Sequence, residues 1–289
     1  MKDADYRSDI TLPIDDFFKF DQKALVSATP IELNDPRFKE QNFKMIEIQP
    51  TFDYKKELWL HHTNNTLQAL KTVLSKLDNE EAAPLPICVF INSTDIIYSL
   101  MKQLDLLEDS AVFCAPKSVD KLKKNRFCNV YEEWNKDKMK RYNFFTSRFF
   151  NAVDMELEEQ PHVIMLTDVY FAEHTMIDPY TDAIQIVGRF RNGVSSITYI
   201  SNTKKGLPQR SKEEIKGYLI CSKEIYRTMK NFYDCATDRA SRDAYRAALE
   251  SLPFNRMLDR NGRENWFAID NYMDEELMKN YFHDENYSI

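Results

Sequence analysis

The chain has 289 residues, of which 43% are hydrophobic and 29% charged, and its formal net charge is −7. These values are typical of a soluble globular protein with one large domain or two smaller ones, and no apolar run approaches the roughly 18 residues of a membrane span. The five cysteines form no C-x-x-C pair and the histidines no H-E-x-x-H pattern, so we expect no disulfide framework, no metal site and a reducing, cytoplasmic location.

Most of the chain alternates short apolar runs with helical patterns. The run PICVFIN at 86–92 is rich in β-branched and aromatic residues, as in a strand buried on both faces. Leucines at helical spacing mark the segment 66–77 as an amphipathic helix. By the same criteria we expect strands at 42–48, 86–92, 110–115, 141–146, 162–169 and 196–201, and helices at 66–77, 93–104, 118–124 and 182–190.

This alternation indicates βαβ units, and therefore an α/β fold with a parallel sheet flanked by helices. In such sheets ligands bind beyond the carboxyl ends of the strands, so functional residues are expected directly after each strand. Beyond residue 203 the pattern changes: a linker at 206–214 precedes helices at 213–236 and 238–252, a turn at 259–265 and a last helix at 273–282.

The segment QIVGRFRNG at 185–193 contains glycines spaced like those of a phosphate loop. Gly188 and Gly193 match G-x-x-x-x-G, but Val194 and Ser195 follow instead of the lysine that reaches the terminal phosphates. The segment also ends a predicted helix, whereas a phosphate loop opens one. No G-x-x-x-x-G-K-[ST] and no D-E-x-[DH] magnesium motif occurs anywhere in the chain.

Four short segments nevertheless follow one another in a fixed order. They are VSATP at 26–30, VFINST at 89–94, FFTSRFFNAVDM at 144–155 and QIVGRFRNG at 185–193. In order and spacing they resemble motifs III, IV, V and VI of the superfamily 2 helicases, and the resemblance covers roughly residues 20–202. It implies a RecA-like sheet, and a nucleic-acid motor with two such domains that bind ATP in the cleft between them.

The resemblance also implies that this chain is part of a larger motor. Residues 1–35 would be the tail of the first RecA-like domain, residues 36–202 the second, and residues 203–289 a helical C-terminal extension. ATP and Mg²⁺ would be held mainly by an upstream domain that carries the phosphate loop and the magnesium carboxylates. The implied partners are that domain and DNA or RNA, with no membrane, and the isolated chain is expected not to hydrolyse ATP.

Motif VI supplies the residues that the resemblance makes catalytic, Arg189, Arg191 and Gln185. A guanidinium is a planar, permanently charged fork suited to the charge that develops on a transferred phosphoryl group. Gln185 precedes Arg189 by about one helical turn and would share its face. The usual spacing is Q-x-x-G-R-x-x-R, and here the second arginine comes one residue early. On a helix this rotates it by about 100°, so Arg189 is favoured for the γ-phosphate without excluding Arg191.

Motif V departs from its usual pattern at one position, where Ala152 replaces a glycine. The resemblance gives Asp154 a role at the ribose or in pairing with a motif VI arginine, and it places Gly188 on the nucleotide side. For nucleic-acid phosphates it implies Thr146 and Ser147 of motif V. For motif IV the resemblance implies that Asn92 and Ser93 contact the nucleic acid, although Ser93 is explained nearly as well as a plain N-cap. For motif III it implies that Ser27 and Thr29 couple the two domains.

Charge is distributed unevenly. Residues 117–141 contain nine Lys or Arg against four acidic residues, whereas the last twenty residues contain six acidic residues and one lysine. The basic segment lies between motifs IV and V, where it would be either a surface for nucleic-acid phosphates or a solvated helix face. Phe144, Phe145, Phe149 and Phe150 are expected in the core rather than stacked on bases.

A second reading of a different class stays open. The motif-like segments could be structural in a non-catalytic α/β module, whose tyrosine-rich C-terminal helices bind a protein partner or whose surface binds nucleic acid. A stand-alone Rossmann-type enzyme is disfavoured, because the chain has only five glycines and no glycine-rich first turn.

Overall fold

The computed structural model describes residues 13–51, 53, 55–80, 84–151 and 153–284. These divide into two compact units, each treated separately below. The sheet unit comprises residues 50–206 with the segment from 282, and the helical unit comprises residues 13–49 and 207–281. These boundaries differ from the predicted division at residues 35 and 202, because the N-terminal segment packs with the C-terminal helices in one hydrophobic cluster.

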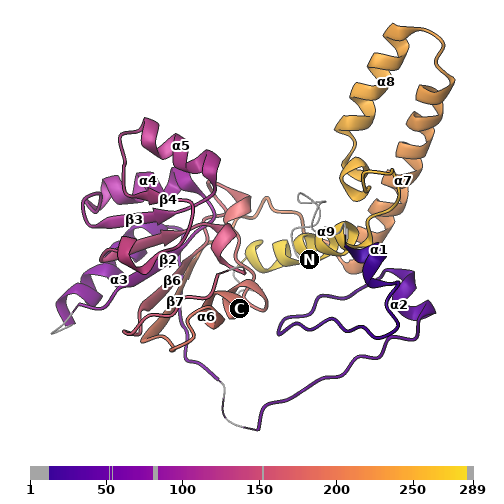
Figure 1. The fold of residues 1–289 in the computed structure, drawn as a ribbon. Helices are drawn as coiled ribbons and strands as arrows, with labels where there is room; N and C mark the ends of the chain where they lie inside the picture. The colour runs from indigo at the N-terminus through magenta and orange to yellow at the C-terminus, as the bar shows by residue number, and fades with distance from the viewer. Residues whose placement is uncertain (1–12, 52, 54, 81–83, 152, 285–289) are drawn as a thin grey trace. The chain divides into compact units, whose positions relative to one another are not determined.

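The sheet unit contains a seven-stranded, entirely parallel sheet (Figure 1). Its strand order is β1-β7-β6-β2-β5-β3-β4, which confirms the predicted α/β class and is consistent with a RecA-like fold. The strands are β1 (Trp59–His62), β2 (Ile87–Phe90), β3 (Ser110–Phe113), β4 (Val130–Tyr131), β5 (Tyr142–Phe145), β6 (His162–Leu166) and β7 (Ser196–Ser201). The edge strands β1 and β4 were not predicted.

The helices of this unit are α3 (Thr66–Glu80), α4 (Thr94–Gln103), α5 (Pro116–Lys124) and α6 (Asp182–Gly188). Short 3-10 turns lie at Lys136–Lys138, Ser147–Phe149 and Glu173–Thr175. Side chains of α3, α4 and α5 pack in one cluster with alternate residues of the central strands, among them Val89, Val112 and Phe144. Because side chains alternate along a strand, the neighbouring residues Phe90, Phe113 and Phe145 occupy the opposite face.

Those three phenylalanines form a row across the sheet. The strand register pairs Phe145 with both Phe90 and Phe113, and each neighbouring pair of ring centroids is 4.9 Å apart. This distance equals the usual spacing of neighbouring strands, so the parallel register alone stacks the rings. Phe149 and Phe150 pack edge-on against the row. All four phenylalanines of motif V are buried, which confirms their predicted place in the core.

The helical unit is built from both ends of the chain. It contains α1 (Ile14–Phe17), α2 (Pro36–Glu40), α7 (Lys212–Cys235), α8 (Arg239–Ser251), a 3-10 turn at Pro253–Met257 and α9 (Trp266–Met278), followed by a 3-10 turn at Lys279–Phe282. α7 begins with a capping box between Ser211 and Glu214, and α7 and α8 form a helical hairpin (Figure 1). The predicted turn at 259–265 is present, with Gly262 at a φ of 73°.

One predicted strand is absent. Residues 42–48 alternate apolar and polar side chains, yet they form no strand, and Met45, Ile46 and Ile48 are exposed. The strand-like run before VSATP is likewise in no strand. A strand needs a hydrogen-bonding neighbour, and the described residues provide none for either segment, so the sequence pattern alone was not sufficient.

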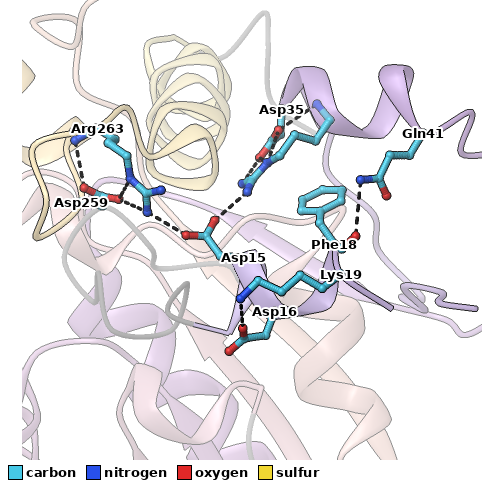
Figure 2. Close-up of polar contacts among 9 residues, drawn as sticks. Asp15, Asp16, Phe18, Lys19, Asp35, Gln41, Asp259 and Arg263 are labelled. Carbon is cyan, nitrogen blue, oxygen red and sulfur yellow. Dashed lines mark hydrogen bonds and ion pairs between the residues drawn. The ribbon is translucent and has the colours of Figure 1, made fainter. Parts of the chain in front are cut away.

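A chain of ion pairs joins α1 and α2 to the C-terminal part of the helical unit (Figure 2). The Asp15 carboxylate accepts hydrogen bonds from Arg263 Nη2 at 2.7 Å and from Arg37 Nη1 at 2.6 Å. Arg37 also binds Asp35, and Arg263 binds Asp259. The hydrogen bonds from Arg263 and Arg37 lower the pKa of the Asp15 carboxyl below its ordinary value of 3.8.

We therefore expect Asp15→Asn to flatten the acid dependence of unfolding. A carboxyl whose pKa is lowered by folding stabilises the protein above its unfolded pKa and loses this contribution as the pH falls through the folded value. The wild type should lose stability more steeply than Asp15→Asn as the pH falls below about 4, measured by urea unfolding at several pH values. Asp16→Asn is the control, because it removes only an exposed ion pair with Lys19, and its stability should follow the wild-type dependence on pH. If Asp15→Asn also follows the wild-type dependence, the proposed role of Asp15 is wrong.

Candidate functional site: an arginine pair at Asp154

Two arginines of the segment 185–193 converge on one carboxylate of the segment 144–155. Arg189 Nη1 lies 3.1 Å from Asp154 Oδ1, and Arg191 Nη2 lies 2.9 and 2.8 Å from the two Asp154 oxygens. The resemblance implied for Asp154 a role at the ribose or in pairing with an arginine of this segment; the contact with both arginines is present, and its role in a motor stays a prediction. Ala152, which replaces the motif V glycine, lies outside the described residues.

The backbone explains why both arginines reach the same partner. α6 ends at Gly188, so Arg191 is not on the helix and the expected helical rotation of its side chain does not apply. Phe190 instead forms a parallel bridge with Met155, and the Phe190 ring is buried. The backbone around this bridge is tied to Met155 by two hydrogen bonds, from Met155 N–H to the Arg189 carbonyl oxygen and from Arg191 N–H to the Met155 carbonyl oxygen, which brings both arginines next to the segment that carries Asp154. The shortened spacing therefore keeps the two arginines together.

Gln185 lies where the helical spacing placed it. Arg189 Nη2 donates to Gln185 Oε1 at 3.2 Å, and Arg189 Nε donates to the Gln185 carbonyl oxygen at 3.2 Å. These contacts fix the Arg189 guanidinium against α6. Gly188 lies between Gln185 and Arg189 in the sequence. A Cβ atom at position 188 would meet no atom within 4 Å, so close packing is not the reason for a glycine here.

The site retains positive charge and open space. Two guanidinium groups face one carboxylate, which leaves one positive charge, and half of the Arg191 side chain is exposed. An open hollow of about 510 Å³ lies beside Asp154, but its wall carries three acidic side chains and one lysine and neither arginine, so the hollow itself does not suit a phosphate. Trp134 and Glu156 line this hollow, and neither residue was predicted from the sequence to belong to a site. The hollow is lined by Trp134, Asn135, Lys136, Asp137, Asp154 and Glu156.

Motifs IV and V meet where β2 and β5 end. Asn92 follows β2, and its Oδ1 accepts the Ser147 backbone N–H at 3.3 Å. The Asn92 Nδ2 donates to the carbonyl oxygen of His174 at 3.0 Å. Asn92 therefore joins the segments that follow β2, β5 and β6, at the edge of the sheet where ligands are expected.

The other two predicted nucleic-acid residues have structural roles here. Ser93 is the N-cap of α4, and its Oγ accepts the Ile96 backbone N–H at 3.4 Å. Thr146 is buried, and its backbone N–H donates to the Phe113 carbonyl oxygen at 3.2 Å. Ser147 is only half-buried, and its predicted contact with a phosphate stays a prediction.

Ser27 and Thr29 belong to the helical unit, in an exposed turn where the Thr29 N–H donates to Ser27 Oγ at 3.1 Å. The basic segment 117–141 covers α5 and the edge strand β4 in the sheet unit. Three of its cations bind carboxylates, which lowers the charge available to an external anion. These ion pairs are Lys121–Asp95, Lys136–Glu158 and Arg141–Asp78. Whether this segment is a phosphate surface or a solvated face stays a prediction.

In the described part of the chain, no group of three or more His, Cys, Asp or Glu side chains is arranged to hold a metal ion, and no helix there is long and apolar enough to cross a membrane. Comparison with known proteins gives no match to a protein-family model and none to a curated protein.

Proposed function

We propose that this chain supplies the second motor domain of an ATP-dependent superfamily 2 helicase or translocase that acts on DNA or RNA. The observation that carries the proposal is the convergence of Arg189 and Arg191 on Asp154. A site for a transferred phosphoryl group needs cations held in a fixed direction, and Asp154 holds both arginines of the segment 185–193 in this way. The four ordered motifs and the parallel sheet support the same function.

In this function the arginine pair contacts the γ-phosphate of an ATP molecule that the upstream domain holds. Gln185 and Asp154 keep the Arg189 guanidinium oriented, so little reorganisation is required when the domains close. The ATP phosphates fit the arginine pair by charge, and Mg²⁺ would be bound by the upstream domain, because the described residues of this chain offer no carboxylate cluster. Hydrolysis then depends on domain closure, which couples chemistry to movement along a nucleic-acid strand.

Contacts to the nucleic acid fall at the carboxyl ends of β2 and β5. Asn92 and Ser147 are fixed to each other there, and hydroxyl and amide groups at strand ends suit the sugar-phosphate backbone, which needs no base readout. Ser93 and Thr146 would contribute indirectly: Ser93 caps α4, and the Thr146 backbone is held by its hydrogen bond to Phe113.

The experiment compares two proteins in the same assay. One is the isolated chain, and the other, called the joined protein below, is the chain expressed in continuity with the coding sequence directly upstream of Met1. We expect no ATP turnover from the isolated chain, and turnover stimulated by single-stranded DNA or RNA from the joined protein. Nucleic-acid-stimulated turnover by the isolated chain, or an upstream sequence without G-x-x-x-x-G-K-[ST], would contradict the proposal and favour a non-catalytic module.

A further inference from the structure

Two consecutive aromatic side chains are exposed at the carboxyl edge of the sheet. Tyr170 and Phe171 follow β6 and are 65% and 83% exposed. They belong to residues 168–175, which we call the aromatic loop. One exposed aromatic residue is ordinary on a protein surface. Two in succession, at the edge where parallel sheets of α/β proteins bind their ligands, indicate a contact surface.

The aromatic loop has a rigid base. The buried Asp168 carboxylate accepts hydrogen bonds from Thr66 Oγ1 and Asn202 Nδ2, each at 2.7 Å. Thr175 Oγ1 accepts the Asp168 N–H at 2.9 Å and donates to the Ala172 carbonyl oxygen at 2.7 Å. The Ala172 N–H donates to the Asp168 carbonyl oxygen at 3.0 Å and closes the turn that carries the two rings. Because this backbone is already fixed, little conformational entropy is lost when the rings contact a ligand.

The aromatic loop is tied to the segments on both of its sides. β7, β6, β2 and β5 are consecutive neighbours in the sheet, with a spacing of about 4.8 Å between parallel strands. Asn92, after β2, donates to the His174 carbonyl oxygen of the aromatic loop and accepts the Ser147 N–H after β5. Lys204, after β7, binds Glu173 of the aromatic loop at 3.4 Å. The segments after these four strands therefore form one row along the carboxyl edge.

Charge along this row favours an anionic ligand. The exposed carboxylate of the aromatic loop, Glu173, is neutralised by Lys204. Arg148 after β5 is half-buried and Lys205 after β7 is exposed, and neither side chain forms an ion pair with any residue that the structure describes. Cations at both ends of a row, with aromatic rings between them, match the requirements of single-stranded nucleic acid: the cations attract phosphates and the rings stack on bases. A protein partner would instead need a contiguous apolar patch.

We propose that Tyr170 and Phe171 stack on bases of a single-stranded nucleic acid whose phosphates contact Arg148 and Lys205. The inference rests on the proposed function, which names DNA or RNA as the partner. It adds base stacking by a loop that belongs to none of the four motif segments. Since every base has a π-face, such stacking accepts any sequence. Asp168 is a positioning residue, because its hydrogen bonds hold the loop that carries the rings.

The test compares two single strands of equal length and charge, a labelled oligothymidine and an abasic strand without bases. Fluorescence anisotropy measures their affinity for the isolated chain. Phe171→Ala and Tyr170→Ala should each weaken oligothymidine binding about fivefold or more, and neither should weaken binding of the abasic strand. Equal losses for both strands would overturn the proposal, because the rings would then not contact bases. Absence of oligothymidine binding by both the isolated chain and the joined protein would also overturn it.

A matched control uses an exposed aromatic residue at the opposite edge of the same sheet. Trp59 is 62% exposed but begins β1, so it lies at the amino edge. Trp59→Ala should bind oligothymidine as the wild type does, and a loss equal to that of Phe171→Ala would contradict the proposal. Circular dichroism checks that the variants fold.

Two conservative variants separate stacking from apolar contact. Phe171→Trp keeps an aromatic ring and should retain oligothymidine binding. Phe171→Leu keeps apolar bulk without a π-face, so its affinity should resemble that of Phe171→Ala. Full binding by Phe171→Leu would show that stacking is not the interaction.

ATP turnover by the joined protein distinguishes this inference from the proposed function. Phe171→Ala should raise the oligothymidine concentration that gives half-maximal stimulation about fivefold or more. If nucleic acid stimulates turnover but this concentration does not change, only the stacking inference fails. If Phe171→Ala weakens oligothymidine binding but the joined protein shows no stimulated turnover, the motor function fails and the aromatic loop stands as a nucleic-acid surface.

Discussion

Replacing Arg189 with alanine should lower ATP turnover by the joined protein about 10³-fold or more, the lower range for arginine fingers in other phosphoryl-transfer enzymes. Arg189 is favoured over Arg191 because four contacts orient its guanidinium, two to Gln185, one to Asp154 and one to the Asn151 carbonyl oxygen. Its side chain is 17% exposed, against 50% for Arg191. ATP affinity should change little, since the upstream domain would supply most of the binding. Steady-state turnover and the affinity for a non-hydrolysable ATP analogue measure the two quantities.

Three further variants make this result specific. Arg189→Lys keeps the charge but loses the planar fork, so it should restore little activity. Arg191→Ala should have a smaller effect than Arg189→Ala, and a larger effect would reverse the assignment within the pair. Arg239→Ala is the control, because this side chain on α8 is 96% exposed. Unchanged turnover in both Arg189→Ala and Arg191→Ala would exclude an arginine finger at this site.

The fold was predictable where a segment carries its own signal. The central strands β2, β3, β5, β6 and β7 are apolar on both sides, and each was expected within a few residues of its observed range. β1 and β4 were missed for different reasons: none of the four side chains of β1 is fully buried, and β4 has only two residues. Residues 42–48 show the opposite case, since their pattern is that of a strand but no neighbour among the described residues pairs with them.

The arginine site was predictable in its members but not in its geometry. The motif spacing identified Gln185, Arg189 and Asp154, and the helical period placed Gln185 beside Arg189. The position of Arg191 depended on where α6 ends and on the bridge between Phe190 and Met155. That bridge joins segments 35 residues apart in the sequence, and no local propensity encodes such a contact. The place of Arg191 relative to Arg189 therefore could not be read from a helical period, because α6 ends at Gly188.

The second large effect is expected in the core of the sheet unit. Phe145→Ala removes the middle ring of the row formed with Phe90 and Phe113, and the neighbouring strands cannot move together to close the space because their backbone hydrogen bonds hold them apart. The transfer and cavity costs of such a substitution are about 3–5 kcal/mol. This is a large part of the roughly 5–15 kcal/mol that stabilises a typical domain.

Unfolding by urea, followed by circular dichroism, measures this loss directly. The matched control is Phe171→Ala, since Phe171 is in the same unit and 83% exposed; its effect should be within about 0.5 kcal/mol of zero. A loss below about 1 kcal/mol for Phe145→Ala would show that the ring row adds little. The result also bears on function, because Phe145 immediately precedes Thr146 and Ser147. If the chain acts on nucleic acid as proposed, a destabilised β5 should displace Ser147 from Asn92 and thereby weaken that binding.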